Sequence, residues 1–397
     1  MVVVGQGPAG LFVASLVALL AQPVVVVAEA AGTLELWDGH LDFRSWTAEE
    51  RRPVTDPWAW WADYGPGHFA GADDLGRWRR LWAFEGALFR DLGVSNAIMP
   101  PRHNRWIVTA LGDVRPAFWV PWWQYGRDEP EPVVVVGVEG FWDFVPDVVA
   151  ARYRRMTGLS AEPLLLPCPT DWEPSWQALR WATYLDGPRG SAWLVEAVSA
   201  SLGRSRPPGP LLFPQILGLE QTEILIARLA QALSCPVGEV GLVAPSVGGL
   251  RLRRRWRRWL AARGVAVIRG RVRGASGDRV FLEDGRLLPA RHVVLATGGI
   301  LGGGLVVEPS GTVREPITGT VVGTIGDGVS AGVVARWGVP PDYGTMSAVG
   351  RLVGGCDPDW DGDGGAVALW TAAAAVERAV PEAGGLESWA KRFGWAM

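Results

Sequence analysis

The 397-residue sequence predicts an α/β protein built around a parallel sheet, and three observations support this fold class. The chain begins with a run of valines that ends in a glycine-rich turn and continues into a helical pattern. A second run of valines follows this helix, and the later apolar run 292–296 ends in another glycine-containing turn. Short continuous apolar runs are typical of parallel strands that are buried on both faces.

The composition fits a folded protein with more than one domain. Hydrophobic residues make up 48% and charged residues 20% of the chain, and the length favours two domains. The net charge of -3 provides no basic field for nucleic acid. Cys168, Cys235 and Cys356 are far apart and form no CxxC pair, so we expect neither a disulfide framework nor a metal site. A reduced, cytoplasmic setting is the default.

The first turn has the pattern G-x-G-x-x-G at residues 5–10, GQGPAG. Gly5 permits a tight turn, and Gly7 leaves room for a pyrophosphate against the backbone. Ala9 belongs to the same turn, and Gly10 lets the helix pack closely on the strand. The helix N-terminus adds free N–H groups and the positive end of its dipole.

An acidic residue completes the fingerprint. The second strand, PVVVVAE, ends at Glu29, whose carboxylate can accept a ribose hydroxyl. The arrangement predicts a Rossmann-like FAD/NAD(P)-binding domain; the alternative is a glycine turn in an ordinary α/β domain. The apolar stretch Leu11–Val27 contains Gln22 and Pro23 and divides into a helix and a strand, so we do not expect it to span a membrane.

The last third of the chain predicts a β-meander that leads back into the sheet. Residues 265–291 contain short strand patterns with a hairpin signal at Asp284-Gly285. The strand HVVLA then runs into Thr297, Gly298 and Gly299, a pattern typical of flavin and pyridine-nucleotide oxidoreductases. A glycine-rich loop and an alanine-rich helix follow. We expect this loop to return to the cofactor through Gly354, Gly355, Gly364 and Gly365.

These elements suggest a discontinuous domain. Residues 1–45 and 285–397 would form the flavin-binding domain, and 46–284 an inserted α+β cap or substrate domain. The strand-rich run 265–284 would lead back to the first domain. The insert is rich in tryptophan, as in DPWAWW and VPWWQY. Core packing is the first interpretation of these residues, and a patch that faces a membrane or partner is the second.

Several segments together suggest a family. They include GHLDF, VGVEGFWDF, LLFPQILGLE, APSVGGLRL, VVLATGGILGGGLVVEPSGTVREPITG and VGRLVGGCDP. The most specific parts are Gly303–Glu308 and Arg314–Gly319. On these residues the chain resembles the B subunit of anaerobic glycerol-3-phosphate dehydrogenase.

The resemblance implies a flavoprotein that works with a catalytic A subunit and an iron–sulfur C subunit at the inner face of the cell membrane. Together they would oxidise sn-glycerol 3-phosphate to dihydroxyacetone phosphate in anaerobic respiration and pass electrons to quinone. The family indicates FMN, whereas Glu29 and the glycine fingerprint suit FAD. The last loop departs from many flavoproteins, because Gly350-Arg351 stands where Gly-Asp is common.

Three residues are candidates for the chemistry. Oxidation of a secondary alcohol needs a base, and His40 lies near Asp42 after the second strand. A phosphate substrate needs guanidinium groups, and Arg251 and Arg314 lie in the family-like segments. The alternative for the two arginines is ordinary ion pairing. If the A subunit oxidises the substrate, this chain is an electron relay and needs no base.

Two further motifs look like binding sites but have simpler interpretations. The arginines of RLRRRWRRW fit a solvated helix face, and a helix that docks an acidic partner is the second interpretation. DPDWDGDGG resembles the start of a calcium loop, but Ala368 occupies the position of the bidentate glutamate. Three other functions remain open: a free-standing flavin oxidoreductase, an RNA-modifying flavoprotein and a non-catalytic assembly protein.

Overall fold

The computed structural model describes the chain apart from residues 48, 65–73, 96–99, 174–175, 204–206, 242–244, 277, 327–336, 356 and 396–397. The described chain forms two compact units. The first comprises Met1–Leu34, Leu41–Arg102 and Arg253–Met397, and the second comprises Glu35–His40 and His103–Leu252. Cys356 lies outside the described residues, as does Ala244 of the family-like segment 244–252.

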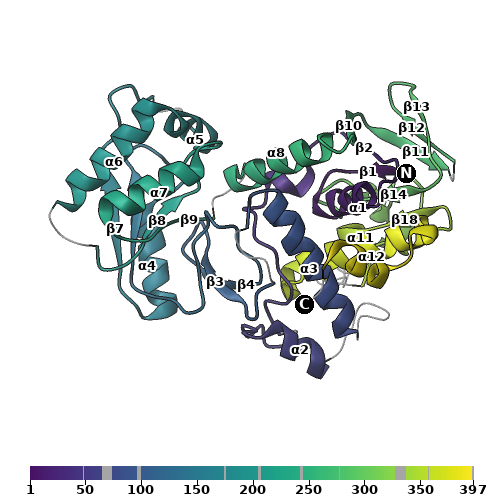
Figure 1. The fold of residues 1–397 in the computed structure, drawn as a ribbon, viewed down its shortest axis with the longest axis horizontal. Coiled ribbons are helices and arrows are strands. Elements are labelled where there is room, and N and C mark those ends of the chain that lie inside the picture. Colours follow the sequence, from purple (N-terminus) through teal and green to yellow (C-terminus); the bar gives the residue numbers. More distant parts are fainter. Residues whose placement is uncertain are drawn as a thin grey trace. The chain divides into compact units, whose positions relative to one another are not determined.

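The first unit contains a five-stranded parallel sheet (Figure 1). Val3 of β1 lies opposite Val26 of β2 on one side and Val294 of β14 on the other. In chain order the strands run 3-2-1-4-5 across the sheet, which is the order of a Rossmann fold, so the predicted fold class is confirmed. The order is β10 (Ala266–Arg269), β2 (Val25–Ala28), β1 (Val2–Val4), β14 (Val293–Leu295) and β18 (Met346–Ala348).

Helix α1 (Pro8–Leu19) is buried along most of its length and packs against α11 (Gly364–Ala379). This burial explains why α1 is apolar on all sides instead of amphipathic. Small side chains on α11, such as Ala372 and Ala373, let the two helices approach closely. The unit also contains α2 (Pro57–Tyr64), α3 (Leu75–Asp91), η2 (Gly350–Leu352), α10 (Pro358–Asp361), η3 (Pro381–Ala383) and α12 (Leu386–Phe393).

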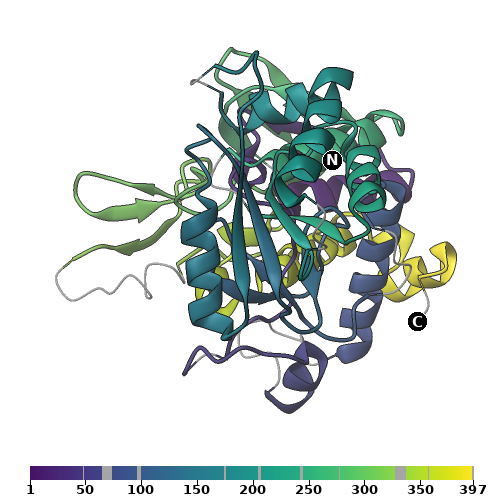
Figure 2. The same cartoon turned by 90° about the vertical axis from the view of Figure 1, so that its left-hand side faces the viewer.

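Two antiparallel sheets complete the first unit. The predicted hairpin at Asp284-Gly285 is confirmed, because Gly285 has φ +86° between two paired strands. The meander consists of β11 (Val272–Ser276), β12 (Arg279–Leu282) and β13 (Leu287–Pro289). A second ribbon, light green in Figure 2, consists of β15 (Val306–Val307), β16 (Thr312–Arg314) and β17 (Val321–Thr324).

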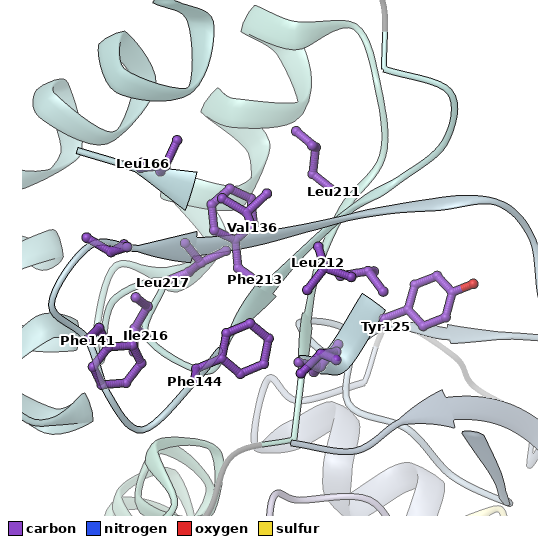
Figure 3. Packing of buried hydrophobic residues seen from close by; sticks show 14 of the residues in the cluster. Tyr125, Val136, Phe141, Phe144, Leu166, Leu211, Leu212, Phe213, Ile216 and Leu217 are labelled. Carbon is purple, nitrogen blue, oxygen red and sulfur yellow. The ribbon is translucent and has the colours of Figure 1, made fainter. Parts of the chain in front are cut away.

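The second unit has a parallel sheet of its own, in the order β7-β6-β8-β9. Its core contains Val136, Phe213 and Leu217, which lie together in Figure 3. The strands are β6 (Val133–Val138), β7 (Ala161–Leu166), β8 (Leu211–Pro214) and β9 (Val237–Val240), and the helices are α4 (Pro146–Thr157), α5 (Ala178–Asp186), α6 (Pro188–Leu202) and α7 (Thr222–Leu233). A small antiparallel sheet contains β3 (Arg105–Val108), β4 (Val114–Ala117) and β5 (Gly126–Arg127). Two further elements, η1 (Gly32–Glu35) and α8 (Val247–Ala261), cross the division between the units.

The boundaries of the two compact units differ from the domain boundaries that the sequence predicted. Residues 46–102 and 253–284, which the sequence analysis assigned to the insert, are part of the first unit. The reason is pairing and packing: β10 extends the sheet beside β2, and α3 contacts α11 and α12. The assignment of a substrate domain stays a prediction.

Much of the tryptophan-rich sequence is core. Phe43 lies 5.1 Å from Trp78 and 5.3 Å from Trp82 between ring centroids, and Trp78 lies 4.7 Å from Trp370. Trp61 is also buried. The interpretation as core packing is confirmed for Trp61 of DPWAWW and for Trp123 of VPWWQY, which is also buried. None of the helices in the described part of the chain has both the length and the apolar character needed to cross a membrane.

Candidate functional site: a cavity at the first parallel sheet

The glycine-rich turn after β1 is closely packed against β14. Gly5 has φ +111°, and a Cβ there would lie 2.2 Å from the carbonyl oxygen of Ala296. A Cβ on Gly10 would lie 2.2 Å from the carbonyl oxygen of Gly5. Both positions therefore require glycine for packing, as the sequence analysis argued from the motif.

Gly7 differs from its two neighbours because it faces open space. It is the N-cap of α1, with no side-chain cap, and Pro8 follows it in the first turn. The nearest atom to a Cβ on Gly7 would be Thr33 Oγ1, at 3.9 Å. The first N–H groups of a helix have no partner within the helix. The turn thus presents backbone donors and the positive end of the dipole to an open space.

That space is a cavity of about 490 Å³ at the carboxyl ends of β1, β2 and β14. Ligand sites of open α/β sheets lie at this edge. The lining comprises Val4, Gly5, Gln6, Gly7, Val27, Ala28, Glu29, Ala30, Gly32, Thr33, Gly270, Arg271, Val272, Arg273, Glu283, Ala296, Thr297, Gly298, Gly302, Gly303, Val306, Pro316 and Ile317.

Among the residues proposed for cofactor binding, five line this cavity: Gly5, Gly7, Glu29, Thr297 and Gly298. The carboxylate of Glu29 is exposed, and its Oε2 lies 3.8 Å from Nε of Arg271. The structure brings these residues together from three separate strands, at the place where the glycine motif predicted a ligand.

The remaining proposed cofactor residues lie outside the lining, and several of them are closely packed against other parts of the first unit. A Cβ on Gly350 would lie 2.6 Å from Cβ of Ala9, and a Cβ on Gly299 would lie 3.2 Å from Cγ of Arg351. A Cβ on Gly365 would lie 2.6 Å from the carbonyl oxygen of Asp42. Gly10, Gly354, Gly355 and Gly364 are likewise absent from the lining. A cofactor contact by these residues stays a prediction.

Two buried polar atoms beside the cavity lack partners. Gln6 donates from Nε2 to the carbonyl oxygen of Ala30 at 2.7 Å, but its Oε1 has no hydrogen-bond partner among the described residues. The hydroxyl oxygen of Thr297 is also buried and has no hydrogen-bond partner among the described residues. A buried polar atom without a partner is costly, so both atoms fit a site in which a ligand supplies hydrogen bonds. Gln6 lies inside the motif, yet its side chain was not singled out, because the pattern specifies only glycines.

The meander and the 302–317 segment supply lining residues that the sequence analysis missed. Arg271 and Arg273 come from β11 and the turn before it, and Pro316 and Ile317 follow β16. No local pattern marks these residues, because they reach the cavity only through the pairing of β10 with β2 and the return of the chain through β14.

A buried charge cluster lies at the start of α11. Arg44 donates from Nη2 to Oδ1 of Asp361 at 3.0 Å. It also donates from Nη1 to Oδ2 of Asp363 at 3.5 Å. Burial raises the pKa of Asp363 to about 7, although Arg44 opposes the shift. The Oδ1 of Asp363 has no hydrogen-bond partner in the described chain. The sequence DPDWDGDGG thus supplies the two aspartates that pair with Arg44. Within the described residues, no group of metal-ligating side chains is suited to hold an ion.

His40 belongs to the second unit and pairs with Asp38, whereas the sequence analysis placed it near Asp42. Nδ1 of His40 contacts Oδ1 of Asp38 closely, and Nε2 of Gln124 donates to Oδ2 of Asp38 at 3.0 Å. Burial would raise the pKa of Asp38, but His40, Arg115 and Gln124 lower it overall. Such a pair fixes the tautomer of an imidazole. A catalytic role for His40 stays a prediction.

The two arginines proposed to bind phosphate have protein partners. Arg251 is 2% exposed, and it donates from Nη2 to Oε1 of Glu239 at 2.9 Å and from Nε to the carbonyl oxygen of Gly218 at 2.8 Å. Arg314 donates from Nε to Oε1 of Glu308 at 2.9 Å. The ion-pairing alternative thus describes the contacts of both residues, and substrate binding by either one stays a prediction.

Sequence comparisons agree with the resemblance noted above. The chain is 28% identical to a protein of Pectobacterium carotovorum over 71% of its length and 74% of that protein, and 29% identical to one of Pectobacterium atrosepticum over 80% and 79%. A Yersinia pseudotuberculosis protein is 24% identical over 96% of this chain and 98% of its own. All three are named as the B subunit of anaerobic glycerol-3-phosphate dehydrogenase. This chain is similar to that B subunit. No protein-family model matches the chain.

Solved structures give only distant matches. Pseudomonas aeruginosa PqsL in complex with 2-aminobenzoylacetate is 13% identical, with a TM-score of 0.33, and the match covers 99% of this chain and 91% of that chain. A 3-ketosteroid-Δ4-(5α)-dehydrogenase from Rhodococcus jostii is 14% identical, with a TM-score of 0.27, over 75% and 45% of the two chains. The likeness to the B subunit is thus one of sequence, and the Rossmann-like fold follows from the strand order.

Proposed function

We propose that this chain is the flavoprotein subunit of an anaerobic glycerol-3-phosphate dehydrogenase. The observation that carries the proposal is the cavity at the N-terminus of α1, into which Gly7 presents bare backbone. The buried, unpartnered Gln6 Oε1 and Thr297 hydroxyl support a ligand in this place. Proteins with nucleotide-binding folds catalyse many reactions. Similarity to proteins named as the B subunit of this dehydrogenase supports the choice of this one.

The cavity favours FAD over FMN. Phosphates bind best at the N-terminus of α1, because its N–H groups and dipole lie there. The lining extends from this point in two directions, toward Glu29 and Arg271 and toward Thr297 and Pro316. A dinucleotide has groups on both sides of its diphosphate and can fill both parts. The phosphate of FMN is terminal, so FMN would leave the Glu29 part empty. The Glu29 carboxylate would accept a ribose hydroxyl.

The bound flavin would supply the acceptor for hydride in the oxidation of sn-glycerol 3-phosphate to dihydroxyacetone phosphate. This chain would hold that group at the first sheet and exclude water from its buried face. Electrons would then pass toward quinone through an A and a C subunit at the inner face of the membrane. Alternatively, the A subunit oxidises the substrate, and this chain relays the electrons.

The test of the site is Gly7→Asp. The cavity has room for the side chain, so the variant should fold, but its carboxylate would occupy the phosphate position and repel a diphosphate. We expect the purified wild type to release FAD, identified by mass. In the variant the Kd for FAD should rise at least tenfold, which corresponds to about 1.4 kcal/mol, so that most of the flavin is lost during purification.

A matched control comes from the second unit. Gly187 is also an N-cap followed by a proline, at the start of α6, and has similar dihedral angles. Gly187→Asp should keep full flavin content. A Gly7→Asp protein with wild-type occupancy would show that the cofactor does not bind at α1, and a wild type that takes up neither FAD nor FMN would end the proposal.

A further inference from the structure

An exposed apolar surface covers the antiparallel ribbon and the turn before it. Large hydrophobic side chains are normally scattered singly on a protein surface, whereas contiguous groups mark interaction sites. Leu301 is 86% exposed, and the other members are between 39% and 52% exposed. We call this set the ribbon patch: Ile300, Leu301, Val306, Val307, Val321 and Ile325.

The strand register places part of the patch on one face of the ribbon. Val306 of β15 lies opposite Arg314 of β16, and Arg314 lies opposite Val321 of β17. The neighbouring Val313 points to the other face of β16 and is fully buried. An antiparallel sheet with one solvated face normally carries polar residues there. Here two exposed valines flank an arginine whose charge is paired with Glu308, and Thr312 and Thr324 share this face, so the face has no unpaired charge at these positions and exposes apolar side chains beside uncharged ones.

The patch is continuous with the rim of the cavity. Val306 belongs to both the patch and the cavity lining, and Gly302 and Gly303, which follow Leu301, also line the cavity. A redox group bound there exchanges electrons only with a partner whose own carrier comes close. The ribbon and the 300–303 turn are where a second protein would approach the cavity within the first unit.

We propose that the ribbon patch is the docking surface for the redox partner subunit of the same complex, which presents an apolar face and its own electron carrier beside the cavity. The inference rests on the proposed function. An unlike subunit fits better than a second copy, because the similar proteins are named as one lettered subunit of a dehydrogenase. A second copy of this chain would bring only another flavin of the same kind, whereas passing electrons onward needs a different carrier beside the cavity.

The test is the double variant Leu301→Asp and Val321→Asp. The chain is co-expressed with the catalytic and iron–sulfur subunits of its complex and purified through a tag on this chain. We expect at least a tenfold loss of co-purified subunits and of electron transfer to a soluble quinone, with unchanged flavin per chain. Leu287→Asp is the matched control, since Leu287 is a leucine 58% exposed on the other antiparallel sheet. It should leave assembly intact.

The outcomes separate this inference from the proposed function. A flavin-loaded double variant that retains its subunits would overturn the docking surface alone. So would a wild type that binds flavin but recruits no other subunit, or that forms a dimer through the patch. A wild type without flavin would overturn the proposed function itself, whatever its assembly.

Discussion

The chain contains two parallel sheets, and they differ in the residues that come directly after their strands. After β1 the chain makes a turn of Gly5 and Gly7 that adds no side chains, and a cavity remains. After β6 and β8 the chain places Phe141, Phe144 and Ile216 over the strand ends, where they are buried (Figure 3). Both sheets have the edge at which α/β proteins bind ligands. The side chains of the turn therefore decide how much of that edge is open.

The Glu239 cluster of the second unit and the polar atoms beside the cavity differ in their hydrogen bonds, although other buried atoms of the second unit, such as Oε1 of Gln124, also lack a partner among the described residues. In the second unit Glu239 accepts hydrogen bonds from the backbone N–H of Leu217 and from Arg251, so the charged groups satisfy one another. Beside the first sheet, Gln6 and Thr297 keep buried oxygens without partners among the described residues. A self-satisfied cluster stabilises a fold, whereas unmet hydrogen-bonding capacity beside a cavity is suited to a ligand.

The largest effect on stability is expected in the closed region. Arg251→Ala should lower the free energy of unfolding by about 3–5 kcal/mol, because it leaves the Glu239 carboxylate buried without its charge partner. Urea unfolding measures the change. The double variant Arg251→Met with Glu239→Leu should recover most of the loss. A variant Arg251→Ala that is as stable as the wild type but fails to bind a phosphate substrate would contradict this expectation. It would show that Arg251 binds the substrate and does not stabilise the fold.

A smaller loss is expected in the turn after β1. Gly10→Ala should cost about 3 kcal/mol, since its Cβ would overlap the carbonyl oxygen of Gly5 and force the turn away from β14. Thermal unfolding of the cofactor-free protein measures this cost without a contribution from binding. Gly7→Ala is the control and should cost much less, because the same atom would meet only Thr33 Oγ1 at 3.9 Å. Equal losses would contradict the distinction between the two glycines.

The smallest effect depends on pH and concerns the amino end of the first sheet. Burial and the charge of Arg378 lower the pKa of His292 to about 4. An unfolded histidine titrates near 6.5, so this contribution to stability is complete above pH 6.5 and is lost as the pH falls through 4. The full shift corresponds to about 3 kcal/mol between pH 7 and 4, and with a discount for solvent screening we expect a loss of about 2 kcal/mol from this group. His292→Gln should remove that part of the acid sensitivity; an identical pH profile would show that His292 is not buried uncharged.

The fold of the first sheet could be predicted because its signals are local. A run of valines, a glycine turn, a helical pattern and a second run of valines follow one another in the sequence. Each of them indicates a backbone conformation within a few residues. The sequence predicted only an α+β insert over residues 46–284 for the region of the second parallel sheet, since no local pattern states that β6, β7, β8 and β9 pair with one another. The contact of His40 with Asp38 could not be predicted for the same reason: Asp38 and Asp42 are equally near in sequence, and the fold places Nδ1 of His40 against Asp38.

By itself, the sequence determined that a tight glycine turn joins a buried strand to a buried helix, because φ +111° at Gly5 and the close approach at Gly10 exclude other residues. Only the tertiary structure decided which distant residues meet that turn. Arg271, Thr297 and Pro316 reach the cavity through pairing between strands far apart in the sequence, as between Val25 and Ala266 and between Val2 and Val293. Such contacts depend on the collective free energy of packing the whole sheet, which no short segment contains.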